Sequence, residues 1–174
     1  KAFLVSGAAT SDLTGKACSP NTIHWTYDTW MLANGTGSAI VKTGGDTWFF
    51  LTADYAFGHA LERDTEAVVL KNGGKVNGKV RHPFPSADFS SFLLQAQSSK
   101  AKIIGLANAG ADTTNAIKQG AEFGIVKAGG IVVATLPLPR AKALTQIAAK
   151  ARCSLALRAA RLRGERVDRE AVLR

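Results

Sequence analysis

The residues best suited to bind a ligand form a turn of small side chains, Ser6-Gly-Ala-Ala-Thr10, directly after an apolar run. That run is typical of a β-strand, and the carboxyl ends of strands are where open α/β sheets bind ligands. Backbone N–H groups and the Thr10 hydroxyl could hold a carboxylate there without a formal positive charge. The alternative, which the residue types alone favour, is a tight strand-to-helix turn with Thr10 as the helix cap.

Two further groups of residues follow strand-like runs in the same way. Tyr55 and Phe57 come after the most aromatic run of the chain, and their rings could line an apolar pocket or pack on the helix that follows. Asn108 and Ala109 open a short stretch up to Asp112 after another run. That stretch either faces a ligand or is a loop in which Asp112 caps the next helix.

The patterns that mark catalytic, metal and nucleotide sites do not occur in the sequence. None of His24, His59 and His82 has a second histidine or a cysteine three or four residues away, so we expect no metal site. Asn34-Gly-Thr-Gly37 lacks the third glycine of the dinucleotide fingerprint, and we interpret it as a plain turn before a strand. No GxSxG nucleophile turn is present either. We therefore expect a protein that is not an enzyme and has no cofactor.

The alternation of strand-like and helix-like runs predicts an α/β fold, a three-layer Rossmann-like parallel sheet with an incomplete first lobe. The expected strands are 2–5, 22–27, 47–52, 75–82, 102–107 and 130–134. Four helices are expected. The first begins near Thr29, the second spans 56–71, the third begins at Ser86 and ends near Ser98, and the fourth spans 112–123. Asn72-Gly-Gly74 and Gly124 are the expected helix stops.

Three segments are expected along the chain, 1–37, 38–126 and 127–174. The first has two strands and one helix, too few to cover both faces of a parallel sheet, so we interpret it as the remnant of a lobe. The third is an atypical basic tail rich in Ala, Leu and Arg, with 11 Lys and Arg against 3 acids, whereas residues 1–126 have 11 against 10. A near-neutral body gives no electrostatic reason to bind nucleic acid. A helix is plausible at the start of the tail, between Leu144 and Leu155.

The ends and the cysteines add little. No apolar run approaches the roughly 18 to 20 residues of a membrane-spanning helix. The chain opens on a strand-like run without the apolar core and cleavage site of a secretory signal. Cys18 and Cys153 allow at most one internal disulfide.

Six stretches in order resemble the branched-chain amino acid (leucine/isoleucine/valine-binding) family of periplasmic solute-binding proteins, which have the type I periplasmic-binding fold. They are Val5-Ser-Gly-Ala-Ala-Thr-Ser-Asp-Leu-Thr14, Thr22-Ile-His-Trp-Thr-Tyr-Asp28, Leu51-Thr-Ala-Asp-Tyr-Ala-Phe-Gly58, Asp88-Phe-Ser-Ser-Phe92, Ile104-Gly-Leu-Ala-Asn-Ala-Gly110, and Ala116-Ile-Lys-Gln119 with Glu122-Phe-Gly124. The resemblance covers residues 1–125. It implies two Rossmann-like lobes that close on a ligand, and residues 38–126 would belong to the second lobe.

The resemblance also implies which residues bind the ligand. By position, Ala8 and Thr10 match the grip on the ligand carboxylate, and Phe57 matches an aromatic wall of the second lobe. Asn108 or Ala109 matches a ligand-facing position that is often Tyr, and losing that hydroxyl weakens the case for amino acid specificity. The candidate ligand-binding residues are Ala8, Thr10, Tyr27, Asp28, Tyr55, Phe57, Asn108 and Ala109.

The implied function is transport. The family's members bind a branched-chain amino acid or another small carboxylate, aromatic ones included, in the periplasm and deliver it to a membrane ABC permease. The alternative is the ligand-sensing domain of a receptor or regulator with the same fold. Because the family's lobes would begin before Lys1 and extend beyond Val126, we expect the chain to be a fragment.

Overall fold

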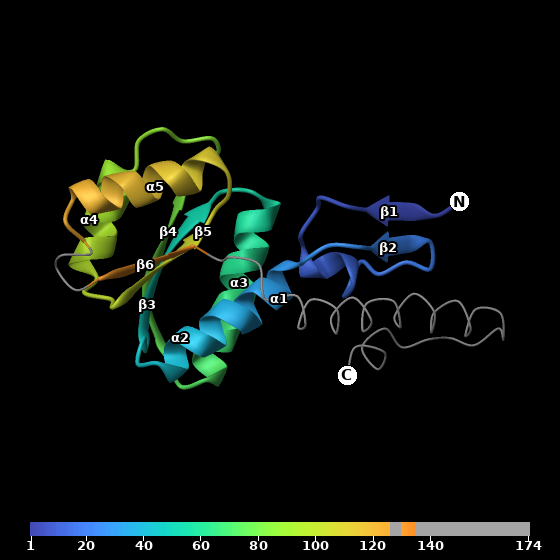
Figure 1. Cartoon of the computed structure of the whole chain (residues 1–174), viewed down its shortest axis with the longest axis horizontal. Helices are drawn as coiled ribbons and strands as arrows, with labels where there is room; N and C mark the ends of the chain where they lie inside the picture. Colours follow the sequence, from blue (N-terminus) through green and yellow to red (C-terminus); the bar gives the residue numbers. More distant parts are fainter. Residues whose placement is uncertain (126–129, 135–174) are drawn as a thin grey trace.

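The described part of the chain, residues 1–125 and 130–134, forms two parallel sheets joined by a helical segment in the computed structural model (Figure 1). The strands are β1 (Phe3–Val5), β2 (Thr22–His24), β3 (Thr47–Ala53), β4 (Lys75–His82), β5 (Ile103–Ala107) and β6 (Ile131–Ala134). The helices are η1 (Ser11–Leu13), α1 (Thr29–Leu32), η2 (Ala33–Gly37), α2 (Ser38–Lys42), α3 (Ala56–Lys71), α4 (Ser90–Ser98) and α5 (Ala111–Glu122). None of the helices in the described ranges is long and apolar enough to span a bilayer.

The larger sheet has the strand order β4-β3-β5-β6, and every pair is parallel. Trp48 on β3 lies opposite Ile103 on β5, and Ile103 lies opposite Ile131 on β6. β3 is buried along nearly its whole length, as expected of a central parallel strand that helices cover on both faces. The predicted α/β class and the parallel pairing of the three expected central strands are confirmed.

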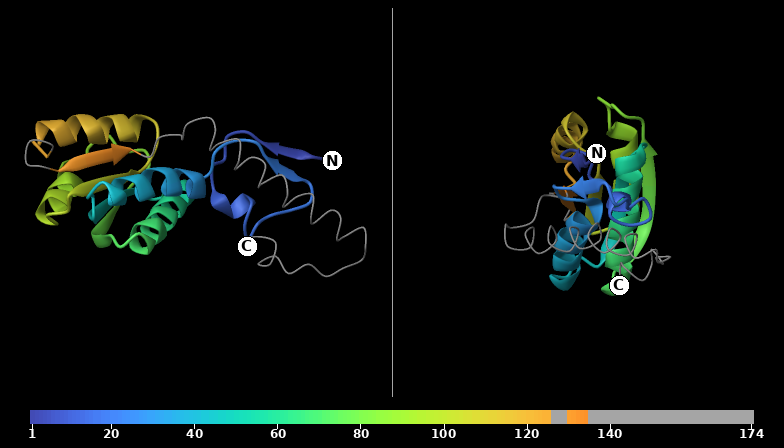
Figure 2. Two further views of the ribbon diagram at one scale, coloured as in Figure 1. Left: turned by 60° about the horizontal axis from the view of Figure 1, so that its bottom comes forward. Right: turned by 90° about the vertical axis from the view of Figure 1, so that its right-hand side faces the viewer.

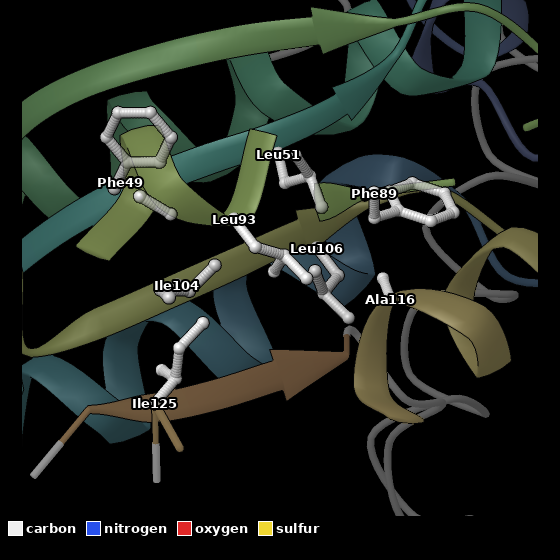
Figure 3. Packing of buried hydrophobic residues seen from close by; sticks show 9 residues of the cluster. Phe49, Leu51, Phe89, Leu93, Ile104, Leu106, Ala116 and Ile125 are labelled. Carbon is white, nitrogen blue, oxygen red and sulfur yellow. The ribbon is translucent and has the colours of Figure 1, made fainter. Parts of the chain in front are cut away.

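Alternate side chains of the central strands enter two separate cores, which is the period-two rule for a β-strand. Phe49, Leu51 and Leu106 pack against α4 and α5, where Phe89 and Leu93 complete the cluster shown in Figure 3. A second cluster on the opposite face contains Trp48, Phe50, Ile103 and Val69, together with Ile40 and Val41 of α2. The sheet is therefore the middle of three layers.

The helix near Thr29 is longer than the sequence predicts. α1, η2 and α2 run on without a break from Thr29 to Lys42, so the predicted plain turn at Asn34-Gly-Thr-Gly37, with a strand after it, is wrong. Gly37 has helical angles, and a Cβ there would lie 3.4 Å from Val68 on α3. That distance is an ordinary van der Waals contact, so the segment packs on α3 at Gly37, and a local turn rule does not anticipate such a tertiary contact. The expected segment boundary after residue 37 falls inside the helix.

Three other element ends also differ from the sequence-based prediction. α4 begins at Ser90 and not at Ser86, because tertiary contacts engage Ser86 and Phe89: the Ser86 N–H donates to Asp112 and the Phe89 N–H to Gln119. β2 ends at His24 rather than residue 27. α5 begins at Ala111, one residue before the predicted start, and its N-cap is Gly110, with a positive φ of 65°. The alternative in which Asp112 caps this helix is therefore not realised.

The amino-terminal strands form a small sheet of their own. β1 and β2 pair in parallel from Phe3 opposite Thr22 to Val5 opposite His24, and they extend away from the larger sheet (Figure 2). Phe3, Leu4 and Trp25 are each more than 60% exposed. The first segment thus has strand pairing but little apolar cover among the described residues. Residues 130–134 of the expected tail 127–174 are described and contain β6, whereas the rest of that tail, including the helix expected between 144 and 155, lies outside the described residues.

Candidate ligand-binding site

The carboxyl ends of β3, β4 and β5 lie at one edge of the larger sheet, because the strands are parallel. Ala53 at the end of β3 lies opposite His82 at the end of β4, and Thr52 lies opposite Ala107. The residues that follow these ends are therefore neighbours in space although they are far apart in the sequence. This edge is the candidate site.

Three aromatic rings gather at this edge. Tyr55 follows β3 and stacks on Phe84, which follows β4, with ring centroids 4.5 Å apart and planes 18° apart. Phe57, in the first turn of α3, lies 5.9 Å from Tyr55, centroid to centroid. Phe84 is half exposed, and Tyr55 and Phe57 are partly buried, so solvent reaches part of the group. Such a surface suits a flat or apolar ligand.

The phenol of Tyr55 has an altered acidity. Burial raises its pKa above the ordinary value, and the nearby charge of Asp112 and the phenol of Tyr27 raise it further. Each cause disfavours the phenolate, by desolvation or by repulsion between negative charges. Because the phenol of Tyr27 contributes to the raised pKa of Tyr55, Tyr27 of the first segment lies close enough to Tyr55 to interact with it electrostatically.

A buried polar network lies at the same edge. His82 is fully buried, and its Nε2 is 3.3 Å from the side-chain amide nitrogen of Asn108, whose oxygen accepts a 2.8 Å hydrogen bond from Thr113. The Nδ1 of His82 lies 2.9 Å from the Pro83 carbonyl oxygen and 3.7 Å from a carboxylate oxygen of Asp112. The side-chain amide of Asn108 is thus already engaged on both sides, and Ala109 is the more exposed of the two candidate residues.

The first-segment candidates have definite local roles. Thr10 caps η1, where its hydroxyl oxygen accepts from the N–H of Asp12 at 3.2 Å. Asp28 is buried and caps α1, accepting from the Met31 N–H at 2.8 Å. Ala8 and Tyr27 are exposed. The capping alternative for Thr10 is therefore realised, and its hydroxyl hydrogen can still be donated to a ligand.

The structure brings Tyr55, Phe57, Asn108 and Ala109 to one edge, and it adds two residues that the sequence analysis did not select. Phe84 follows a predicted strand between two prolines, so the rule that selected Tyr55 could have found it. His82 gave no such signal, because a lone histidine at a strand end has no distinctive spacing.

Known proteins are similar to this chain in both sequence and structure. The profile of the periplasmic binding protein family matches residues 1–168, and so extends into the segment expected to be an atypical tail. No curated protein sequence matches the chain significantly.

Three solved structures illustrate the similarity. A periplasmic binding protein from Burkholderia mallei is 62% identical with a TM-score of 0.76, covering 78% of this chain and 36% of its own. A branched-chain amino acid ABC transporter periplasmic ligand-binding protein from Burkholderia xenovorans is 30% identical, with a TM-score of 0.71 and coverage of 79% and 37%. A solute-binding protein of an ABC transporter from Rhodopseudomonas palustris, in complex with 3,4-dihydroxybenzoic acid, is 25% identical, with a TM-score of 0.68 and coverage of 76% and 36%.

The parallel sheets and their covering helices define the type I periplasmic-binding fold. The chain belongs to the periplasmic binding protein family. It spans about a third of the length of the solved relatives. Its structural relatives include ABC transporter solute-binding proteins, one of them for branched-chain amino acids at 30% identity. Membership of the periplasmic binding protein family is therefore confirmed, and the branched-chain amino acid subfamily stays a prediction.

Proposed function

We propose that this chain is part of an extracytoplasmic solute-binding component of an ABC uptake transporter. The observation that carries the proposal is the aromatic group Tyr55, Phe57 and Phe84 at the carboxyl edge of a parallel sheet, in a chain 62% identical to a periplasmic binding protein. Its solute is a small carboxylate, and its macromolecular partner is a membrane ABC permease. It acts in the periplasm, where its relatives act.

Two lines support an aromatic acid over a branched-chain amino acid as the solute. The stacked rings of Tyr55 and Phe84 present a flat apolar surface. A relative of 25% identity was solved with 3,4-dihydroxybenzoic acid.

The carboxylate of the solute would be held by the loop after β1. The N–H groups near Ala8 and the Thr10 hydroxyl are neutral donors, which can bind a carboxylate once water is excluded. Closure of a second lobe would supply that exclusion. Because the chain spans about a third of its relatives' length, it would leave the site open on one side.

Calorimetric titration tests the proposal with two proteins. The first is the chain itself, and the second is a chimera in which residues 1–134 replace the matching segment of the Burkholderia mallei relative. We expect the chimera to bind benzoate or hydroxybenzoates at micromolar concentration and leucine at least tenfold more weakly. The chain alone should bind all of them about a hundredfold or more weakly than the chimera, since half of the contacts are worth several factors of ten.

A matched pair of variants tests the site within the chimera. Phe84→Ala removes the stacked ring and should weaken aromatic acid binding about tenfold, whereas Leu94→Ala removes an exposed apolar side chain of α4 and should leave binding unchanged. Tighter binding of leucine than of any aromatic acid would reject the proposed solute class. Binding of none of these acids would reject the proposed site.

A further inference from the structure

The carboxylate of Asp64 on α3 connects two parts of the molecule that are distant in the sequence. One of its oxygens accepts hydrogen bonds from the Ser11 hydroxyl at 2.7 Å and from the Thr29 hydroxyl at 2.6 Å. The other accepts from the guanidinium of Arg63, with the Nε at 3.0 Å. Ser11 belongs to η1 after the first strand, and Thr29 begins α1. We call Ser11, Thr29, Arg63 and Asp64 the clasp.

The clasp holds the backbone of the candidate carboxylate-binding loop. The Thr29 N–H donates to the Ala9 carbonyl at 2.7 Å, and the Ser11 N–H donates to the Thr29 hydroxyl oxygen at 3.0 Å. Thr29 therefore accepts from the loop with its hydroxyl oxygen and passes the hydroxyl hydrogen to Asp64. Its hydroxyl can serve both partners only while Asp64 is a hydrogen-bond acceptor.

Burial makes this network stronger than an ordinary surface ion pair. Thr29 is fully buried, and the side chain of Asp64 is only 10% exposed. Hydrogen bonds from hydroxyls to an ionised carboxylate are short and about twice as strong as neutral ones. Arg63 is half exposed and also reaches the Ser11 hydroxyl at 3.1 Å and Asp12 at 3.3 Å. Arg63 thus adds to a contact that Asp64 already makes.

The helix that carries Asp64 also carries the aromatic wall. Phe57 lies in the first turn of α3, and Asp64 lies about two turns later on the same rigid element. The loop around Ala8 and Thr10 is fastened to that helix through Ser11 and Thr29. We infer that Asp64 is a positioning residue that fastens the carboxylate-binding loop to the helix that carries the aromatic wall. The fastening can be tested without a ligand, and its effect on ligand affinity rests on the proposed function.

Hydrogen exchange on the 174-residue chain tests the fastening without a ligand. In Asp64→Asn, the carboxylate that accepts both hydroxyls becomes an amide, and we expect the amides of residues 11–15 and Thr29 to exchange at least tenfold faster. Amides of β3 and β5 should keep their protection, because their contacts are untouched. Glu66→Gln is the matched control on the same helix: it removes the 3.0 Å ion pair with Lys79 of β4 and should leave the loop amides unchanged.

The hydroxyl of Thr29 gives a rescue experiment. Thr29→Val keeps the shape but removes the hydroxyl, and it should reproduce the loop-specific effect of Asp64→Asn. Thr29→Ser restores the hydroxyl and should return loop protection to within about threefold of the wild type. Unchanged loop exchange in both Asp64→Asn and Thr29→Val would overturn the inference. Equal loss of protection in the loop and in β3 would also overturn it, because Asp64 would then only stabilise the fold.

Ligand binding is the second arm, in the chimera with the Burkholderia mallei relative. Asp64→Asn should weaken the binding of an aromatic acid about tenfold while the thermal midpoint of unfolding stays close to that of Glu66→Gln. Unchanged affinity despite a mobile loop would overturn the link between the clasp and the site. If the unmodified chimera binds no acid, the proposed function fails, and the exchange experiments still decide whether Asp64 fastens the loop.

Discussion

At the scale of single residues, the candidate site depends on side chains with two tasks. Tyr55 stacks on Phe84 and also lies near the buried carboxylate of Asp112, so one residue contributes both apolar surface and an electrostatic contact. Asn108 is held between His82 and Thr113, which leaves its amide committed to the protein. The half-exposed rings are therefore the residues at this edge most open to a ligand.

The raised pKa of Tyr55 predicts a loss of stability in alkali. The unfolded chain releases the proton of this phenol with a pKa of ~10. The folded chain keeps the phenol protonated to higher pH, because its pKa is raised. This contribution to stability is complete below the unfolded pKa and is lost as the pH rises through the folded pKa. Because Tyr27 and Tyr55 are the only tyrosines, the ultraviolet titration of Tyr27→Phe reports Tyr55 alone.

We expect that titration to have its midpoint above that of the same variant unfolded in urea. In Tyr55→Phe, the free energy of unfolding should fall less steeply with pH than in the wild type. The difference should lie between about pH 9 and 11, around the ordinary tyrosine pKa of ~10. A folded midpoint at or below the unfolded one would contradict the prediction.

At the scale of elements, α3 is the helix on which most of the site depends. It begins directly after β3, carries Phe57 in its first turn and Asp64 near its middle, and packs on α1 and the sheet. Its start is possible because residue 58 has no side chain. A Cβ there would lie well inside van der Waals contact of the Ala53 carbonyl oxygen and 3.0 Å from that of Ala107. Both obstacles are backbone atoms at the strand ends and cannot rotate away.

Gly58→Ala should therefore lower the free energy of unfolding by about 3 kcal/mol, at the upper end of the overpacking range. Gly7→Ala is the control, because a Cβ at Gly7 would meet no atom within 4 Å, and it should change the stability by less than about 0.5 kcal/mol. Urea unfolding followed by tryptophan fluorescence measures both. Equal stabilities of the two variants would show that α3 can shift away from the strand ends.

At the scale of the whole molecule, the cores and the charge lie in different parts of the chain. The three core clusters of the described residues draw on the segment between Leu32 and Ile125. The excess positive charge belongs to residues 127–174. The family match nevertheless extends to residue 168, so the role of that segment in folding is open to a direct test.

Deleting residues 141–174 should leave the folding of the remainder unchanged, because this basic segment lies outside the stretches that resemble the family. Cys18 is disulfide-bonded in the structure. Urea unfolding of both proteins in a reducing buffer removes that bond, so the comparison reports packing alone. We expect the midpoint and the slope of the transition to match those of the full chain within error. Cooperative unfolding that disappears on deletion would show that the segment is structural.

The sequence by itself determined the elements whose signals are local. The apolar density of 47–52, the periodicity of 56–71 and the Asn72-Gly-Gly stop predict β3 and α3, because strand and helix periods are properties of neighbouring residues. Family membership could also be predicted from the sequence, since the family's motifs are short and occur in order along the chain. The small-residue loop and the aromatic residues after β3 were found as candidates by their position after strands.

Only the tertiary structure decided which residues meet. Gly37 is helical and lies against α3, and α4 starts late because Asp112 and Gln119 engage the backbone before it. The ring pair of Tyr55 and Phe84 joins residues 29 positions apart, and the clasp joins Ser11 to Asp64 across 53 positions. No local period encodes such pairs, because they arise when parallel strands bring distant chain segments to one edge and helices pack across them.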